Sequence, residues 1–510
     1  MAMEFTPYDL EQIMALGKQP EEVHSQLQRF ADGFPDIELC RTVSVGNGLC
    51  KLSSEELNNY IANYEEESKN LQLVKFVPAS GAASRMFKAL YNFLEGQIND
   101  QDKDVRTFFD GINHFAFFEE LTAILRASAD DWIKNKDKKV VEYLLSDNGL
   151  NYGNLPKALI TFHKYNDGST AKAIDEHLVE GSLYCAGADA KVSIHFTVSE
   201  EHMDPIKSYL EKLIPFLEKR FNKKYEISFS IQDKVTDTIA VDLENNPFRL
   251  ENGELLFRPG GHGALLKNLN AIDADIIFIK NIDNVAAQWL IQDTIDYKKA
   301  LGGILLETQR KAFDYCRTIK GSKLLDEKLE KEILNFIDLK LGYKVPESYN
   351  EMTREEKIVF LFDKLNRPLR ICGVVKSSNT GGGPFWVKHP NGSESLQLVE
   401  TAQVNLQNPE QAAILKSSEY ANITDLVCGI KDFEGNKFDL IKFRDPNTGF
   451  IAEKSQGGKT LKAMELPGLW NGAMSDWNTA FVEVPVTTFN PVKTVLDLLN
   501  KEHQGEHEYM

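Results

Sequence analysis

Hydrophobic and polar residues follow two different periods along this chain, one typical of β-strands and one typical of helices. Short runs of β-branched and aromatic residues predict strands at residues 73–77, 192–198, 225–231 and 276–279. Amphipathic stretches predict helices between them, and the helix expected over 201–221 joins two strands as a βαβ unit. Strands that alternate with helices indicate an α/β fold.

Long stretches on either side of these strands are predominantly helical. Residues 7–70 predict a series of helices, and two later stretches have the same periodicity. From Ile371 onward the pattern changes to β structure, so the central sheet is expected to be mixed. The predicted organisation is an N-terminal helical cap at residues 1–70, a catalytic domain at 71–500 and a C-terminal tail at 501–510. Two helical insertions are predicted within the catalytic domain, at about 86–150 and about 286–365.

Charge and cysteine usage narrow the class of protein. The 510 residues include 58 Lys and Arg against 76 Asp and Glu, a formal net charge of −18. This acidic balance excludes nucleic acid and anionic membrane surfaces as the main partner. No apolar run reaches the roughly 18 residues of a membrane-spanning helix, and the N-terminus has no signal-peptide pattern. The six cysteines are widely spaced, so reduced thiols and a cytoplasmic location are expected.

The most informative segment is FRPGGHGALLKNLNAIDADIIFIKNIDNV, residues 257–285. Its glycine turn precedes a predicted helix, where free backbone N–H groups can bind an anion. Asp283 follows a predicted buried strand, at the edge where open α/β sheets bind their ligands. The alternatives are an ordinary turn at Gly260–Gly263 and an Asx turn or helix cap at Asp283. The helix and strand that join the two features favour a phosphate or nucleotide site with a divalent cation.

Two further turns consist of small residues. In the first, Ser80, Gly81 and Ala82 leave room for a phosphate beside the backbone, and Arg85 could chelate phosphate oxygens. A tight strand-to-helix connection explains the same residues equally well. The glycine run at 380–384 is a flap, another anion loop or a surface hairpin. These turns are therefore candidate phosphate sites with open structural alternatives.

Isolated polar residues complete the set of candidates. Lys157 precedes an apolar run from which its ammonium group could reach the site, although most single lysines are surface residues. Lys493 precedes a predicted final amphipathic helix, where the helix dipole disfavours a cation unless an anion is nearby. Gln232 ends a predicted strand and could pair with a nucleobase edge or cap the strand. A helix with a structural or rim-forming role is expected to contain Thr170, Lys172 and His177.

Motifs for covalent catalysis are absent from the sequence. GxSxG and a Walker A motif do not occur, and His163, His195 and His262 lack metal-ligand spacing. No activated nucleophile is visible, so no covalent enzyme intermediate is expected. The candidate residues instead position phosphates and neutralise their charge, which favours phosphoryl or nucleotidyl transfer.

Taken in order, these motifs resemble those of the UDP-sugar pyrophosphorylase branch of the nucleotidyltransferases. PGGHG and NIDN are close to that family's Pro-(Pro/Asp)-Gly-(His/Asn)-Gly and Asn-(Ile/Val)-Asp-Asn pair. Within the superfamily the chain resembles an uncharacterised bacterial branch of the DUF4301 type. Ser80 and Ala83 depart from the family, which usually has glycine at both positions. The similarity spans roughly residues 73–500 and includes Phe76–Lys88, Pro156 with Lys157, Gln232, the segments ICGVV and LVETAQV, and Phe489–Lys493.

The resemblance implies a three-layer α/β/α, GT-A-like (Rossmann-like) fold with a mixed sheet, a helical N-terminal cap and helical insertions. It implies a Mg²⁺-dependent nucleotidyltransferase that joins a nucleoside triphosphate, UTP by resemblance, to a sugar 1-phosphate and releases pyrophosphate. Arg85, Lys157 and Lys493 would be catalytic, and Asp283 would bind the metal. The nucleotide would contact Ser80, Gly81, Ala82, Gln232, Gly260, Gly261 and His262, and the sugar would contact Asn284, Glu400 and Asn471.

Two other functions fit the same residues. A GT-A glycosyltransferase would share the fold and the metal, but it would need an acceptor site and would release a nucleoside diphosphate. A catalytically silent nucleotide-sugar-binding protein would keep the site without turnover, as Ser80 and Ala83 allow. Release of pyrophosphate from a nucleoside triphosphate separates these three functions.

Overall fold

The computed structural model describes residues 5–81, 83–322, 325–377, 382–456 and 459–505. Contacts divide the chain into two compact units, and each unit consists of three separate stretches. Unit 1 comprises Met1–Glu56, Gln232–Ile277 and Leu301–Glu483, and unit 2 comprises Leu57–Ile231, Phe278–Ala300 and Val484–Met510. The domain boundaries expected from the sequence, at residues 70 and 500, remain predictions.

Unit 1 contains parallel and antiparallel strand pairs. One group of strands has the order β2 (Ser44–Val45), β3 (Gly48–Cys50), β19 (Asn478–Glu483), β13 (Leu369–Lys376) and β16 (Tyr420–Gly429). Within it β13 pairs with β19 in parallel and with β16 in antiparallel. A second, antiparallel sheet has the order β1 (Glu38–Thr42), β14 (Gly382–Lys388), β15 (Glu394–Glu400) and β12 (Tyr343–Lys344). The unit also contains the antiparallel pairs β9 (Thr238–Ile239) with β10 (Phe257–Arg258) and β17 (Phe450–Gln456) with β18 (Lys459–Glu465).

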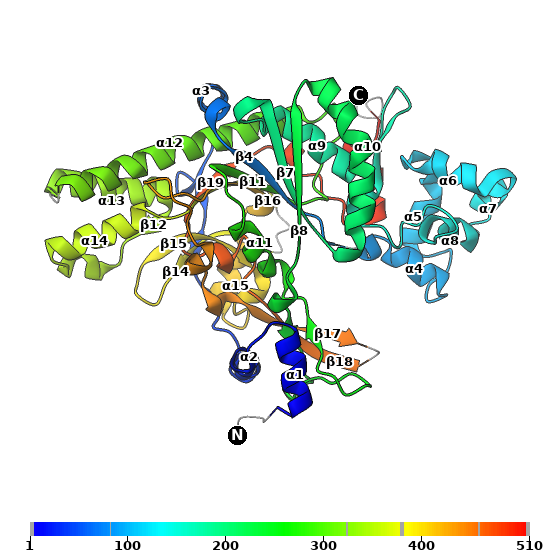
Figure 1. Ribbon diagram of the computed structural model, residues 1–510, viewed down its shortest axis with the longest axis horizontal. Helices are drawn as coiled ribbons and strands as arrows, with labels where there is room; N and C mark the ends of the chain where they lie inside the picture. Colours follow the sequence, from blue (N-terminus) through cyan, green and yellow to red (C-terminus); the bar gives the residue numbers. More distant parts are fainter. Residues whose placement is uncertain (1–4, 82, 323–324, 378–381, 457–458, 506–510) are drawn as a thin grey trace. The chain divides into compact units, whose positions relative to one another are not determined.

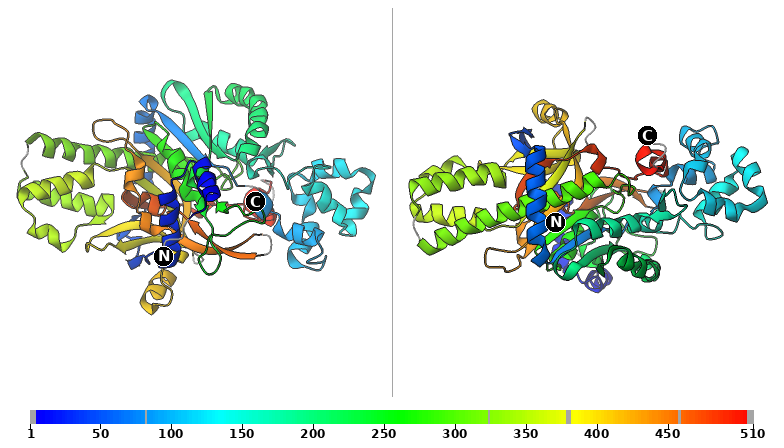
Figure 2. Two further views of the ribbon diagram at one scale, coloured as in Figure 1. Left: turned by 60° about the horizontal axis from the view of Figure 1, so that its bottom comes forward. Right: turned by 90° about the horizontal axis from the view of Figure 1, so that it is seen from above.

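The helices of unit 1 include those of the second predicted insertion. α12 (Gln292–Ser322) begins in unit 2 and continues in unit 1, followed by α13 (Glu327–Leu341) and α14 (Arg354–Leu365). The three helices lie side by side (Figures 1 and 2). Glu332 of α13 pairs with Lys311 of α12 at 3.1 Å, and Glu330 of α13 pairs with Lys357 of α14 at 2.9 Å. The helical character expected for this region is confirmed. Unit 1 also contains α1 (Pro7–Ala15), α2 (Pro20–Asp32) and α15 (Pro409–Lys416).

Unit 2 is built on parallel strands. The order is β4 (Leu73–Pro78), β7 (Lys191–Val198) and β8 (Lys224–Ile231). α10 (Met203–Phe221) joins β7 to β8, which confirms the predicted βαβ unit. α9 (Ala173–Tyr184) is buried along nearly all of its length. A phenylalanine-rich core packs these strands and α9 with the helices of the first predicted insertion, α4 (Lys88–Leu94), α5 (Lys103–Asp110), α6 (Phe118–Leu125), α7 (Ala129–Lys134) and α8 (Lys138–Leu145).

β11 (Ile276–Lys280) is the predicted buried strand that precedes Asp283. Each of its five residues is buried, and the strand passes from unit 1 to unit 2 after Ile277. Its neighbour in the chain is a short helical segment, a 3₁₀ turn at Gly261–Leu265 followed by α11 (Leu266–Asn270). Parallel and antiparallel strands combined with helices confirm the mixed α/β fold expected from the sequence.

Three local predictions were wrong. Thr170 and Lys172 lie in β6 (Thr170–Lys172), not in a helix, because the Asp175 carboxylate caps α9 at Lys172 through a 2.8 Å bond to its backbone N–H. The chain after Lys493 forms 3₁₀ turns at Val495–Leu499 and Lys501–His503 in place of an amphipathic α-helix. Short strands interrupt the predicted helical cap at residues 38–50, because these residues pair with distant strands, β1 with β14 and β3 with β19.

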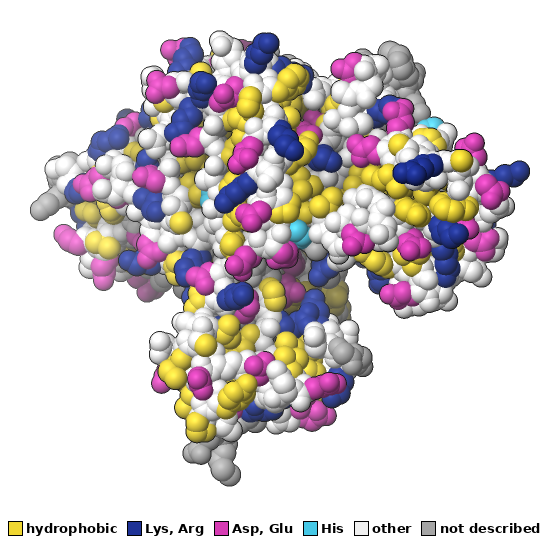
Figure 3. All heavy atoms as spheres, turned by 45° about the vertical axis from the view of Figure 1, so that its right-hand side comes forward, with side chains coloured by type: hydrophobic (Ala, Val, Ile, Leu, Met, Phe, Trp, Pro, Cys, Tyr) yellow, Lys and Arg dark blue, Asp and Glu magenta, His cyan; other side chains and the backbone are white. Residues whose placement is uncertain are grey.

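The surface in Figure 3 mixes charges of both signs. Acidic and basic side chains alternate over this face, so the acidic excess of the sequence is not gathered into one patch there. None of the helices in the described part of the chain has the length and apolar character that crossing a membrane requires.

Candidate functional site

The loop after β11 holds Asp283 in a fixed position within unit 2. Ile282 donates its backbone N–H to the carbonyl oxygen of Pro78 at the end of β4 (3.3 Å). The carbonyl oxygen of Ile282 accepts a hydrogen bond from Nε2 of His177 on α9 (3.2 Å). Val492 donates its backbone N–H to the carbonyl oxygen of Asp283 (3.0 Å). Three segments far apart in the sequence therefore fix this loop.

Two lysine ammonium groups converge on the Asp283 carboxylate. Lys157 lies in a 3₁₀ turn after Pro156, and its Nζ donates to Oδ2 of Asp283 at 3.0 Å. Lys493 Nζ donates to the same oxygen at 3.1 Å. Lys157 also donates to the carbonyl oxygen of Val492 at 2.8 Å. We call Lys157, Asp283 and Lys493 the Asp283 cluster; it contains one cation more than it contains anions.

The cluster explains an unfavourable feature of the sequence. Lys493 precedes the 3₁₀ turn at Val495–Leu499, where a cation gains nothing from the local backbone dipoles. Its ammonium group pairs with the carboxylate of Asp283, a residue 210 positions earlier in the chain. The side chain of Lys493 remains 63 % exposed, whereas that of Lys157 is 14 % exposed. Lys493 is therefore the cation of the cluster that an incoming solute reaches most easily.

Burial and the two lysines act on Asp283 in opposite directions. Burial of the carboxylate would raise its pKa, but the ammonium groups of Lys157 and Lys493 outweigh burial and hold the pKa of Asp283 below its usual value. Asp283 is thus ionised at neutral pH. The cluster presents fixed charge rather than a proton donor or acceptor.

Asp283→Asn is expected to make the free energy of unfolding depend less on pH between pH 7 and pH 3. A carboxylate whose pKa is lowered by folding stabilises the fold above its unfolded pKa, and the stabilisation is lost as the pH falls through the folded pKa. The wild type should therefore exceed the variant by about 1–3 kcal/mol near neutral pH, and the difference should shrink as the pH falls below about 4. Urea unfolding of both proteins from pH 7 to pH 3 measures it.

The matched control for this prediction is Asp147→Asn. Asp147 is exposed, and no described residue pairs with its carboxylate. Its replacement should leave the free energy of unfolding within about 0.5 kcal/mol of the wild type at each pH. A difference between the wild type and Asp283→Asn that stayed constant from pH 7 to pH 3 would show that the Asp283 charge does not stabilise the fold.

The small-residue turn after β4 is the second part of the candidate site in unit 2. Ala82 lies outside the described residues. Ser80 is half-buried and Gly81 is exposed, with open space where a side chain would be at Gly81. Arg85 ends a 3₁₀ turn, is exposed, and pairs with no described carboxylate. It lines a cavity of about 360 Å³ together with Thr494, the residue after Lys493. The arrangement leaves the Arg85 guanidinium available for an anion.

The glycines of the PGGHG turn in unit 1 are required by close packing. A Cβ at Gly260 would lie 2.8 Å from the carbonyl oxygen of Thr236, and one at Gly263 would lie 2.2 Å from the carbonyl oxygen of Pro467. Gly261 has φ +74°, and a Cβ there would lie 2.8 Å from the carboxylate of Glu465. Packing of the turn against residues 465–467 accounts for these glycines, and the anion-binding role of Gly260 and Gly261 remains a prediction.

His262 is held in one tautomer by its neighbours. Its Nδ1 accepts a hydrogen bond from the backbone N–H of Leu469 at 3.0 Å, so the ring proton of the neutral imidazole lies on Nε2. Nε2 is 3.3 Å from Oε1 of Glu400. In this tautomer Nε2 is the donor and the Glu400 carboxylate is the acceptor. The ring stacks on Trp470, with 4.2 Å between ring centroids and 18° between planes. We call His262, Glu400 and Trp470 the His262 cluster.

Two other predicted site residues, Asn471 and Asn284, make hydrogen bonds that hold loops, and a third, Gln232, makes no hydrogen bond to a described residue. Asn471 is buried and donates to the carbonyl oxygen of Leu398 at 2.9 Å. Asn284 is buried, and its Oδ1 accepts the backbone N–H of Asn490 at 2.9 Å. Gln232 is half-buried directly after β8 and makes no hydrogen bond to a described residue. The expected sugar contacts of Asn284 and Asn471 therefore remain predictions for side chains that already anchor loops.

Two important residues were not chosen from the sequence. Trp470 directly precedes the predicted sugar-binding residue Asn471, and only its contact with His262 reveals its role. Arg370, fully buried, donates to the carbonyl oxygen of Trp470 at 2.6 Å and fixes this segment. No local pattern distinguishes these residues, since each depends on a partner distant in the sequence.

The residues present fit a magnesium ion only in part. The described residues contain no group of three or more His, Cys, Asp and Glu side chains that could hold a metal. Asp283 offers one carboxylate, and its Oδ2 already accepts from two lysines. Mg²⁺ is commonly held by one or two carboxylates together with substrate phosphates. Asp283 thus fits a metal that phosphates help to hold, and magnesium remains a prediction.

Three solved structures illustrate what the chain is similar to. A variant of UDP-glucose pyrophosphorylase from Leishmania major is 12% identical over 98% of this chain and 82% of that chain, with a TM-score of 0.45. UDP-glucose phosphorylase from Trypanosoma brucei is 14% identical over 97% and 80%, with a TM-score of 0.44. The uridine diphosphate N-acetylglucosamine pyrophosphorylase of the same organism is 11% identical over 97% and 82%, with a TM-score of 0.47.

The chain belongs to the DUF4301 family. The model of this family, described as a domain of unknown function, matches residues 6–504. A comparison with curated proteins found no match.

Proposed function

We propose that the protein is a nucleotidyltransferase that joins a nucleoside triphosphate, with UTP as the first candidate, to a sugar 1-phosphate and releases pyrophosphate. The observation that carries the proposal is the Asp283 cluster. It holds two ammonium groups within 3.1 Å of one carboxylate oxygen, in a protein whose overall charge is −18. To bind phosphates, a protein with a negative net charge must gather positive charge locally.

The proposed reaction needs no general base from the protein. The phosphate of a sugar 1-phosphate is largely dianionic at neutral pH, because its second pKa is about 6. One of its oxygens attacks the α-phosphorus of the triphosphate, the new P–O bond forms, and the bond to the pyrophosphate oxygen breaks. Charge neutralisation and alignment are then the main tasks of the enzyme. The ionised Asp283 and its two lysines fit these tasks.

The residues of unit 2 would divide the phosphates between them. Lys157 and Lys493 would stabilise the charge that develops around the α-phosphate and the sugar phosphate, and Arg85 would bind the β- and γ-phosphates through its fork of donors. Asp283 would hold the two ammonium groups in place by accepting a hydrogen bond from each. A magnesium ion bound through Asp283 and the phosphates would neutralise further phosphate charge.

The His262 cluster of unit 1 offers groups of the kind that bind sugar and base rings. Glu400 offers carboxylate oxygens to hydroxyl groups, and its Oε1 takes the Nε2 proton of His262 in a hydrogen bond. The stacked rings of His262 and Trp470 provide an apolar surface of the kind on which sugar and base rings pack. Gln232 and Gly261 would contact the nucleoside.

A pyrophosphate-release assay tests the proposal. The protein is incubated with Mg²⁺, each of the four common nucleoside triphosphates, and glucose 1-phosphate, galactose 1-phosphate or N-acetylglucosamine 1-phosphate. Turnover with at least one pair, at roughly 1–10³ s⁻¹ for an enzyme of ordinary efficiency, is the expected result. Pyrophosphate must appear in equal amount to the nucleotide sugar.

Each other outcome of this assay has a definite meaning. Absence of pyrophosphate with every pair contradicts the proposal. Release of nucleoside diphosphate from a nucleotide sugar in the presence of an acceptor identifies a glycosyltransferase instead. Tight binding of a nucleotide sugar without turnover identifies the catalytically silent protein.

A further inference from the structure

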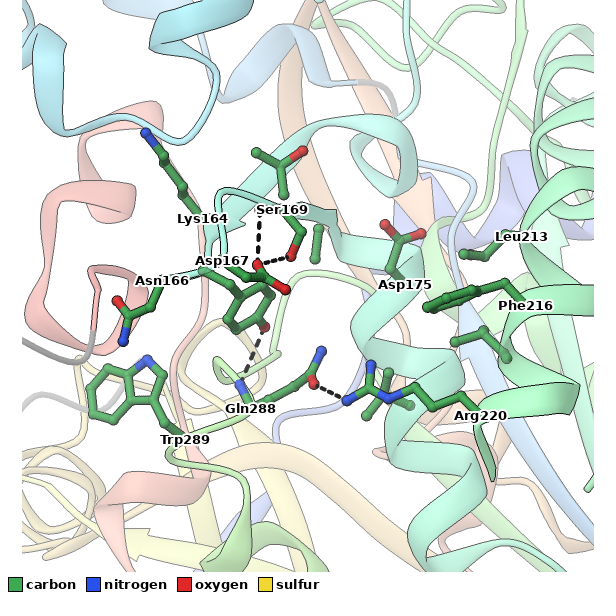
Figure 4. Close-up of a pocket in the computed structure, with 15 residues that line it drawn as sticks. Lys164, Asn166, Asp167, Ser169, Asp175, Leu213, Phe216, Arg220, Gln288 and Trp289 are labelled. Carbon is green, nitrogen blue, oxygen red and sulfur yellow. Dashed lines mark hydrogen bonds between the residues drawn. The ribbon is translucent and has the colours of Figure 1, made fainter. Parts of the chain in front are cut away.

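A cavity separate from the Asp283 cluster lies within unit 2. Its volume is about 720 Å³, within the range of small-molecule sites. The walls come from the hairpin of β5 (Thr161–Lys164) and β6, from α9 and α10, and from residues 288–289. Figure 4 shows Phe216 and Arg220 extending from α10 on one side, with Asn166 and Asp167 of the hairpin turn on the other. We call this cavity the α10 pocket.

One wall of the α10 pocket is apolar. Leu213, Phe216 and Leu217 line it from a single face of α10, at helical spacings of three and four residues. Val179 of α9 lies beside them and is buried. Phe216 is 61 % exposed, which is unusual for a phenylalanine that borders a cavity. A ligand with an apolar or aromatic body would cover this ring.

Three of the charged residues that line the pocket already have partners. Lys164 pairs with Glu119 of α6 at 2.6 Å. Asp167 accepts the backbone N–H of Ser169 at 2.9 Å. Oδ2 of Asp175 accepts the backbone N–H of Lys172 at 2.8 Å and the hydroxyl of Tyr209 at 2.9 Å. These groups hold the hairpin and the start of α9 in place.

Arg220 is the exception among the charged residues of the pocket. It is exposed and forms no ion pair with a described residue, and its Nη2 donates to the neutral Oε1 of Gln288 at 2.7 Å. The backbone N–H of Gln288 donates to the hydroxyl of Tyr165 at 3.3 Å, which fixes Gln288 against the hairpin. The guanidinium also lies over the ring of Phe221, 4.9 Å from the ring centroid, and its charge acts on the Asp167 carboxylate from beyond ion-pair distance. A guanidinium carries five N–H donors, so the bond to Gln288 leaves donors available for an anion.

We propose that the α10 pocket binds a small amphipathic anion. Its apolar or aromatic body packs on Leu213 and Phe216, and its single carboxylate or phosphate is bound by Arg220, which Gln288 holds in position. An arginine fork beside an aromatic ring matches this combination of charge and apolar surface. The site is independent of the proposed nucleotidyl transfer, because none of the residues assigned to that reaction lines the pocket.

Titration with 8-anilinonaphthalene-1-sulfonate, a fluorescent aromatic anion, tests the proposal on the full-length protein. The expected result is one saturable site with a dissociation constant in the micromolar range. Phe216→Ser and Arg220→Gln should each weaken binding at least fivefold. Both side chains are exposed, so both variants should keep the circular dichroism spectrum and melting temperature of the wild type.

Val359→Ser is the matched control for these variants. Val359 of α14 is 69 % exposed and lines a different, largely apolar cavity of about 790 Å³ in unit 1. The control should bind the dye as the wild type does. Unchanged binding in both Phe216→Ser and Arg220→Gln, or an equal loss in Val359→Ser, would overturn the proposal.

Competition experiments identify the head group of the ligand. 3-Phenylpropionate and phenyl phosphate offer the same ring with a carboxylate or a phosphate, and the stronger competitor shows which head group the site prefers. 3-Phenylpropan-1-ol has the ring without the charge and should compete at least fivefold more weakly. Displacement of the dye by the alcohol as readily as by the anions, or by none of the three compounds, would overturn the assignment of Arg220.

Discussion

Lys493→Ala is expected to lower the rate of pyrophosphate release by about 10²- to 10³-fold, the usual cost of removing one group that stabilises transition-state charge. The side chain of Lys493 is 63 % exposed, so the variant should fold as the wild type does. Lys157→Ala should lose activity to the same extent, and it should also lose stability, because Lys157 donates to the carbonyl oxygen of Val492. Initial rates at saturating substrate, with melting curves for each variant, measure both effects.

Two further variants make this prediction specific to the cluster. Lys501→Ala removes an exposed lysine from the same C-terminal stretch, eight positions after Lys493, and should keep full activity. Lys493→Arg keeps the charge with a different geometry and should recover part of the lost rate. Equal activity in Lys493→Ala and Lys501→Ala would remove Lys493 from the proposed site.

Glu180→Gln is expected to destabilise unit 2 strongly. Glu180 of α9 is fully buried, and its carboxylate pairs with Lys75 of β4 at 2.8 Å and with Lys280 of β11 at 2.7 Å. Burial would raise the pKa of Glu180, but the two ammonium groups outweigh it and keep the pKa below its usual value. Glutamine would leave two buried ammonium groups without a counterion, at a cost of about 3–5 kcal/mol.

Differential scanning calorimetry measures this effect. A loss of this size should lower the melting temperature of unit 2 by roughly 6–20 °C. The matched control is Glu66→Gln, which breaks the exposed pair with Lys69 and should leave the melting temperature close to that of the wild type, because solvent screens exposed pairs. Similar melting temperatures for the two variants would mean that water or rearranged side chains compensate the buried lysines.

Helices and strands could be predicted from the sequence more accurately than the contacts between them. The βαβ unit around α10 followed from strand and helix periods alone, since those periods are set by residues close in the chain. The errors arose where the tertiary environment decides. Thr170 and Lys172 became a strand through pairing with β5, and the segment after Lys493 packs on Met86 as 3₁₀ turns.

The candidate site shows the same division. Lys157, Asp283 and Lys493 were chosen from local motifs, and the structure places both ammonium groups within 3.1 Å of Oδ2 of Asp283. Trp470 was missed, because an aromatic residue in a loop has no local signature of function. The roles of the chosen residues in catalysis stay predictions until the variants are assayed.

The division of each unit into three stretches has a consequence for synthesis of the chain. The path passes from one unit to the other after residues 56, 231, 277, 300 and 483. The ribosome therefore synthesises most of unit 2 before the stretch that contains Lys493. Unit 2 stays incomplete during the synthesis of residues 301–483, which belong to unit 1. Until then Asp283 lacks its second lysine, and a nascent chain that stops before residue 493 cannot complete the cluster.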